Sequence, residues 1–357
     1  MRTALLLSAA VGLVAAAPQK IDFAAVNAAP TPSVQGPAIT AKVQRPTYNP
    51  TVAASEAVAS ASADPVASKR KLRARNACSV QPAGSGPLTS SPDTADAFLA
   101  NPVYNQGAGN APTPQGYSLA FGSLTGSTSQ NGYMGLYTLT KYDTIKCQQL
   151  CDAAFGCTAF NIYYERDPSL DPGSTCPDPA STTNIKCTLW GFPICGDTAT
   201  NKGQWLQNFH VVIAGSNGYV KSAPPKSQTD FTGPTGLGGA VQAPLDNGVD
   251  TYIGMRLYPD GAYDPSLCAA VCKQTTAYDA ATADSTGKYK PCNFFNSYVL
   301  SKNNVPQGTY CSFYTRPWDR SYGTNVGQYD GAGNYYSVSQ SYSYTLTTQD
   351  PGVVVRS

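Results

Sequence analysis

The sequence predicts an α+β protein built from two tandem small disulfide-stapled modules, each with one helix packed on an antiparallel sheet, after a disordered leader. Three observations predict this architecture. All eleven cysteines lie between Cys78 and Cys311. Within that stretch, a cysteine-centred pattern of helix and strand signals occurs twice. The preceding residues, 18–68, contain no cysteine and almost no aromatic side chains.

The first 17 residues predict a secretory signal peptide. A positive charge at Arg2 precedes an apolar run from Ala4 to Ala17 that ends in small residues, as is typical of such signals. The run is shorter than the about 20 residues that a membrane helix needs, and no other segment is apolar enough. We therefore expect an extracellular, secreted protein without a membrane anchor, with the cell wall as one destination.

Residues 18–75 predict a disordered, propeptide-like leader. Ala, Pro, Val and Ser dominate this stretch, which cannot bury enough apolar surface to offset its chain entropy. It ends in the chain's one basic cluster, where the pair Lys69-Arg70 is typical of a dibasic processing site in the secretory pathway. A solvated charge run is the alternative interpretation of that cluster.

Net charge excludes two classes of partner. The leader region 1–75 holds nine of the 24 Lys and Arg residues and three of the 22 Asp and Glu residues. Residues 76–357 keep 15 basic and 19 acidic groups, a net charge of −4. Without a basic field, we expect neither nucleic acid nor an anionic membrane surface as a partner.

An internal duplication defines the modules. Tyr142-Asp143 and Tyr263-Asp264 each precede a Cys-x-x-x-Cys pair, with a constant separation of 121 residues between the copies. The separation changes only between blocks, as insertions in loops would produce. The later matched blocks are Cys157–Tyr163 with Cys292–Tyr298, Cys187–Trp190 with Cys311–Tyr314, and Asn201–Trp205 with Asn325–Tyr329.

Each copy predicts one helix followed by strands. Asp143 and Asp264 occupy N-cap positions, and Cys147, Leu150 and Cys151 fall at i, i+3 and i+4, on one face of a short helix. The segments that follow are rich in aromatic and β-branched residues, which favour strands. The predicted boundaries are a signal peptide over 1–17, the leader over 18–75, an N-terminal extension over 76–131, modules over 132–221 and 249–349, a Pro/Gly-rich linker over 222–248 and a tail over 350–357.

The cysteine pattern resembles the PAN/Apple superfamily: two cysteines on a helix, one before an aromatic strand and one before a later strand. With its opening Pro-Gln-Lys-Ile-Asp-Phe over residues 18–23, the chain is similar to tandem PAN/Apple-like secreted proteins of ascomycete fungi. The resemblance implies binding of protein or carbohydrate. It also implies four disulfides, Cys147–Cys187, Cys151–Cys157, Cys268–Cys311 and Cys272–Cys292.

Three cysteines lie outside this pattern: Cys78, Cys176 and Cys195. We expect Cys176 to pair with Cys195, which would leave Cys78 for an intermolecular disulfide. The alternative, Cys78 with Cys195, would tie the extension to the first module.

The sequence predicts no enzyme and no cofactor. Glu165 and Asp167 are the nearest carboxylate pair that could hydrolyse a glycoside, but a surface ion pair of Glu165 with Arg166 or Lys186 is the favoured interpretation. The single histidine, His210, lies in a predicted strand without the nucleophile and acid of a triad. One histidine and no Cys-x-x-Cys pair also argue against zinc.

With enzyme and metal sites disfavoured, the aromatic residues point to a ligand-binding surface. Trp190 and Trp205 are aromatic in both copies, which predicts that they belong to the core. We expect Trp318, among charged turn residues, to be exposed, and we take Trp318, Tyr164 and Arg316 as candidate ligand contacts. The predicted function is a non-catalytic binding protein for polysaccharide or glycoprotein. A structural wall or matrix protein and a cryptic hydrolase are the alternatives.

Overall fold

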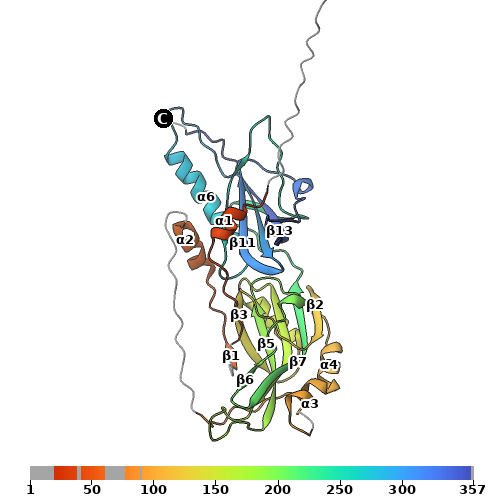
Figure 1. Cartoon of the computed structure of the whole chain (residues 1–357). Helices are drawn as coiled ribbons and strands as arrows, with labels where there is room; N and C mark the ends of the chain where they lie inside the picture. Colours follow the sequence, from red (N-terminus) through yellow and green to blue (C-terminus); the bar gives the residue numbers. More distant parts are fainter. Residues whose placement is uncertain (1–19, 38–41, 61–76, 89–90, 355–357) are drawn as a thin grey trace, which may run out of the picture.

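A computed structural model describes residues 20–37, 42–60, 77–88 and 91–354. The protein is α+β, with two antiparallel sheets in two modules arranged one beyond the other (Figure 1). The predicted signal peptide and the processing pair Lys69-Arg70 lie outside the described residues.

The two sheets share one topology. The order β3-β5-β4-β7-β2 in the first module matches β9-β11-β10-β13-β8 in the second, and β6 on β7 matches β12 on β13. The first sheet comprises β1 (Val43–Gln44), β2 (Tyr117–Leu124), β3 (Tyr133–Leu139), β4 (Ala159–Pro168), β5 (Ser181–Trp190), β6 (Gln204–Leu206) and β7 (Phe209–Lys221). The second comprises β8 (Phe231–Gly236), β9 (Tyr252–Tyr258), β10 (Phe294–Lys302), β11 (Val305–Tyr314), β12 (Gly327–Tyr329) and β13 (Tyr335–Leu346).

The predicted boundaries need correction at two strands. β2 falls in the predicted extension, and β8 falls in the predicted linker over 222–248. Each pairs with the last long strand of its module, so each belongs to the repeat. The glycines and proline of Phe231–Gly236 hide the strand from a composition-based prediction, although Phe231 is buried against Phe295.

The repeated helices cover one face of each sheet. α5 (Thr144–Ala153) and α6 (Pro265–Ala281) begin at the predicted N-caps, where Asp143 accepts from the Lys146 amide at 2.8 Å and Asp264 from the Ser266 amide at 2.9 Å. The extension adds α3 (Ala95–Ala100) and α4 (Pro102–Gly109) to the first core, and two short 3-10 helices are η1 (Gly196–Thr198) and η2 (Arg320–Tyr322).

The four disulfides that the family resemblance implied are present, and each ties a repeated helix to a strand or to the residues just before one. The four bonds join Cys147 to Cys187, Cys151 to Cys157, Cys268 to Cys311, and Cys272 to Cys292. All eight of these cysteines are buried in the two cores. Crosslinks of this kind compensate for the small core of each module.

The expected Cys176–Cys195 bond is wrong. Cys176 pairs with Cys78, and Cys195 forms no disulfide. The cause is a backbone pairing between the extension and the first module: the Cys78 amide donates to the Asp171 carbonyl at 2.7 Å, and the Asp171 amide donates to the Ser79 carbonyl at 2.8 Å. Because Cys78 is paired, it cannot supply the expected intermolecular disulfide.

The prediction of a disordered leader is also wrong for the described part of that segment. It contains α1 (Phe23–Ala28), β1 and α2 (Pro50–Ser60). α1 lies against the second sheet, β1 extends the first sheet beside β3, and α2 packs on α6 (Figure 1). The composition argument considered only what the segment could bury by itself, whereas the two modules supply the apolar surface.

Candidate functional site: exposed aromatic platforms

The three predicted ligand contacts do not form a site. Trp318 is only 7% exposed, and its Nε1 donates to Thr251 Oγ1 at 3.0 Å, so the expected exposure is wrong. Tyr164 is buried in the first module, beside Tyr142. Arg316 lies 4.7 Å above the Trp318 ring and forms an ion pair with Asp246. These side chains complete the cores and turns of separate modules.

Trp205 and Tyr329, at matching positions of the repeat, are instead exposed. Their exposed fractions are 65% and 70%, so the prediction that Trp205 belongs to the core is wrong. Trp190 and its counterpart Tyr314 do belong to the core, at 0% and 1%. The repeat therefore keeps one aromatic position inside each module and one outside.

Both exposed rings lie on short edge strands and rest against the strand beside them. Trp205 in β6 is paired across the ladder with His210, and the two rings stack at 4.2 Å between centroids with 9° between their planes. Tyr329 in β12 is paired in the same way with Tyr335, at 4.8 Å. We call Trp205 with His210 the Trp205 platform and Tyr329 with Tyr335 the Tyr329 platform.

The Asn-x-Gly-Gln sequence before each platform sets its position. In the first module the Gly203 amide donates to Asn201 Oδ1 at 3.1 Å, and in the second the Gly327 amide donates to Asn325 Oδ1 at the same distance. Gly203 has φ +95°, and a Cβ there would lie 1.9 Å from the Val211 carbonyl oxygen. Only glycine allows this close approach, which fixes the edge strand that carries the ring.

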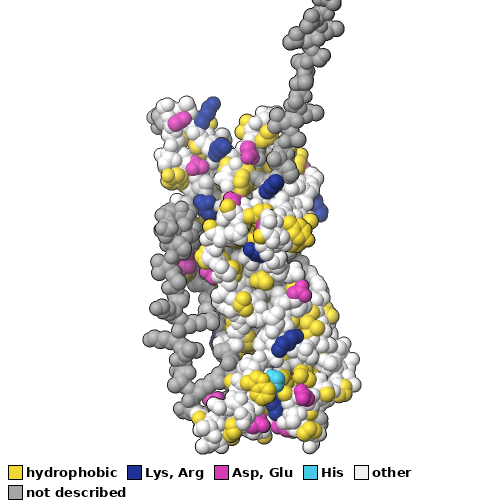
Figure 2. Space-filling view, viewed as in Figure 1, with side chains coloured by type: hydrophobic (Ala, Val, Ile, Leu, Met, Phe, Trp, Pro, Cys, Tyr) yellow, Lys and Arg dark blue, Asp and Glu magenta, His cyan; other side chains and the backbone are white. Residues whose placement is uncertain are grey.

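A hollow of about 320 Å³ adjoins the Trp205 platform. The long β4–β5 connection, which is peculiar to the first copy, forms part of its wall, and the Cys78–Cys176 bond anchors that loop to the extension. Figure 2 shows hydrophobic surface beside the chain's one histidine on this module, with charged side chains scattered singly around it. The lining residues are Ala77, Asp171, Pro172, Trp205, Leu206 and Gln207.

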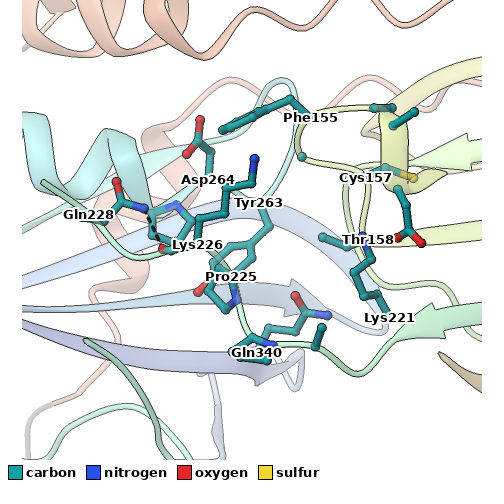
Figure 3. Close-up of a pocket in the computed structure, with 17 residues that line it drawn as sticks. Phe155, Cys157, Thr158, Lys221, Pro225, Lys226, Gln228, Tyr263, Asp264 and Gln340 are labelled. Carbon is teal, nitrogen blue, oxygen red and sulfur yellow. Dashed lines mark hydrogen bonds and ion pairs between the residues drawn. The ribbon is translucent and has the colours of Figure 1, made fainter. Parts of the chain in front are cut away.

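A second cavity, of about 300 Å³, lies where the modules meet. Its cationic groups already have partners, because Lys221 pairs with Asp152 at 2.6 Å and Lys226 lies 5.3 Å above the Phe155 ring. This arrangement leaves little unbalanced charge for a ligand. Figure 3 shows Thr158 and Lys221 of the first module on one side of the cavity, and Asp264 of the second module with Pro225 and Lys226 on the other.

Glu165 does pair with Lys186, but in the interior and not on the surface as expected. Lys186 Nζ contacts Glu165 Oε1 and lies 3.4 Å from Asp167 Oδ2, and all three side chains are at most 7% exposed. Asn184 Nδ2 also donates to Asp167 Oδ2, at 2.5 Å. Neither carboxylate lines the Trp205 hollow or the inter-module cavity.

Burial and neighbouring charges shift the pKa values of these two carboxyls in opposite directions. Burial, reinforced by the Asp167 charge, raises the pKa of Glu165 to about 8. Burial also opposes ionisation of Asp167, but Lys186, Glu165 and Asn184 hold its pKa below the usual range. Burial alone would lower the pKa of Lys186, but the two carboxyls outweigh burial and raise that pKa. The opposite directions of the two shifts favour placing a proton on Glu165 over placing one on Asp167.

Among the described residues, no group of three His, Cys, Asp or Glu side chains is placed to hold a metal ion. Within the same ranges, no helix is long and apolar enough to cross a membrane. Comparison with family models, with curated proteins and with solved structures finds no match for the chain.

Proposed function

We propose that the protein is a secreted, non-catalytic, tandem PAN/Apple-like binding protein that engages carbohydrate or glycoprotein of the cell wall or extracellular space. The observation that carries this proposal is the Trp205 platform, a 65% exposed indole on a fixed edge strand beside a hollow. A large exposed aromatic ring gains nothing for the core, and one held flat against His210 is ready to receive a ligand on its free face.

The chemistry around Trp205 suits a sugar ring. An aromatic face packs against the apolar C–H face of a pyranose, while amide and carboxylate groups at its edge can bond hydroxyl groups. Gln207, an exposed residue that lines the hollow, supplies an amide group of this kind. The Tyr329 platform offers a second, simpler aromatic contact, and two linked contacts on one polymer raise the apparent affinity.

The test measures binding of the secreted chain to insoluble chitin, β-glucan and mannan-bearing wall material, with bound fractions quantified over a concentration series. We expect saturable binding to one polymer and at least a tenfold loss in Trp205→Ala. Tyr278→Ala is the matched control, because Tyr278 is an equally exposed aromatic residue (64%) that lies on α6, away from either platform.

Each outcome separates the alternatives. Binding that is lost in Trp205→Ala and kept in Tyr278→Ala supports the proposal. Binding that both variants retain assigns the surface elsewhere and contradicts it. No saturable binding to any polymer favours the structural-protein alternative, and release of soluble sugar that stops in Glu165→Gln favours the hydrolase.

A further inference from the structure

The second module has a surface that the chain's own N-terminal segment covers. Ile21 and Val26 are only 4% and 6% exposed, because they insert between side chains that project from the face of the sheet opposite α6. Figure 1 shows α1 lying across this face beside β11. The receiving residues are Tyr298, Leu300, Tyr310 and Tyr336, each at most 2% exposed, with Met255, Leu257 and Val338 at the margin.

Polar contacts hold both ends of the inserted segment. At its start the Ile21 amide donates to Gln328 Oε1 at 2.7 Å, and at its end Tyr336 Oη donates to Asn27 Oδ1 at 3.0 Å. Between them the Phe23 ring packs on the Tyr336 ring, 4.8 Å between centroids. Apolar anchors with hydrogen bonds at both ends are the usual anatomy of a bound peptide.

The covered face differs from its counterpart in the first module. Where the second sheet has Leu300 and Tyr310, the first has Glu165 and Lys186 at matching register positions. A face of tyrosines and leucine that large would mark an interaction site if it were uncovered. The second module therefore carries a surface built for a partner, and the first does not.

The segment that fills this surface has the properties of a ligand and not of a core element. None of the five disulfides reaches it, since no cysteine precedes Cys78. Its helix α1 has six residues, well below the about 12 to 15 needed for marginal stability alone. It is ordered because it is bound, as in coupled folding and binding.

We propose that the face formed by Tyr298, Leu300, Tyr310 and Tyr336 is a peptide-binding site, that residues 20–28 of the same chain occupy it, and that the same segment of a second copy of the chain can replace them. The anchors Ile21, Phe23 and Val26 define the recognised pattern as Ile-x-Phe-x-x-Val.

The test uses the full chain with a site-specific protease sequence inserted between residues 37 and 42, cut once after purification, so that the fragment with α1 is free to leave while β1 and α2 stay attached to the modules. A fluorescent peptide of residues 18–37 is then titrated into the cut protein, and its binding is followed by anisotropy while the released leader is measured by gel filtration. Two peptide variants are compared: Phe23→Ala, and Val34→Ala as a matched apolar deletion at a position that is 66% exposed. Because both changes are in the peptide, folding of the modules is not at issue.

We expect saturable exchange, with the half-displacement concentration raised at least tenfold by Phe23→Ala and less than twofold by Val34→Ala. Two results would overturn the proposal: retention of the cut leader at every peptide concentration without exchange, or a Phe23→Ala peptide that competes as well as the native one. Neither readout depends on polysaccharide binding, so failure here leaves the proposed function untouched.

Discussion

The two modules differ most on the sheet face that lies opposite the repeated helix. Tyr163 faces Lys186 across β4 and β5, and Tyr298 faces Tyr310 across β10 and β11, so the two ladders match up to Leu300, where the β10–β11 pairing shifts register. The first module fills this face with a buried ion pair, and the second with aromatic rings under the leader. The positions that are alike in the two copies determine the shared backbone fold. The positions that differ determine whether this face is filled by a buried ion pair or covered by the N-terminal segment.

The largest expected effect tests the charged face. Lys186→Met removes the cation that contacts both buried carboxyls, and breaking a buried ion pair by removing one partner costs about 3 to 5 kcal/mol. We expect a loss of that size in the free energy of unfolding, measured by urea denaturation. Lys202→Met, at an exposed position of the same module, should change it by less than about 0.5 kcal/mol. A loss below about 1 kcal/mol in Lys186→Met would show that this face does not depend on the pair.

An intermediate effect concerns pH. The folded chain holds the Glu165 proton up to a pKa of about 8, while the unfolded chain releases it near 4.5. Because the folded state binds the extra proton between these values, the free energy of unfolding should fall as the pH rises from 4.5 to 8. The pKa of Asp167 is shifted downward, so its titration affects the free energy of unfolding only below the usual pKa of an aspartate. That range lies outside the window from pH 4.5 to 8.

Glu165→Gln should flatten that dependence, because glutamine keeps the shape of the protonated acid without titrating. Denaturation curves at several pH values across the window measure the slope, with Glu56→Gln, an exposed change in α2, as the control. An unchanged slope in Glu165→Gln would assign the pH dependence to another group.

The smallest effect concerns the two platforms, whose stability contributions we expect to be alike. Trp205→Ala and Tyr329→Ala each remove a ring that is more than half exposed, so each should change the free energy of unfolding by about 0.5 kcal/mol or less. Thermal unfolding of both variants beside the parent chain checks this. A loss above about 1 kcal/mol in either would place that ring among the structural residues.

Much of the fold could be predicted from the sequence because local signals and the repeat agree. The N-cap aspartates, the cysteine spacing and the aromatic strands each point to the same elements, and the two helices begin where expected. The misses have a common cause. The leader and β8 acquire their structure from partners far along the chain, such as Tyr336 and β13, and no local pattern records such contacts.

The site was missed for a different reason. An aromatic residue that occurs in both copies predicts a core position, yet a shared edge strand can repeat an exposed ring equally well. The neighbours of Trp205 held the better signal: Lys202, Gln207 and Asn208 are polar and exposed. Trp190, by contrast, follows the buried Leu189. The surroundings of each tryptophan, more than its repetition, separate the two.

The contact between β1 and β3 has a consequence for aggregation. At Gly135 in β3, a Cβ would lie 2.3 Å from the Gln44 carbonyl oxygen of the leader, whereas its counterpart Gly254 in β9 has open space around it. β9 is the edge strand of its sheet, a position prone to pairing with other chains, whereas β1 covers β3 at Leu136 and Tyr137. The leader thus covers an edge strand in one module only. Loss of the leader would expose β3 as a second edge strand that can pair with another molecule.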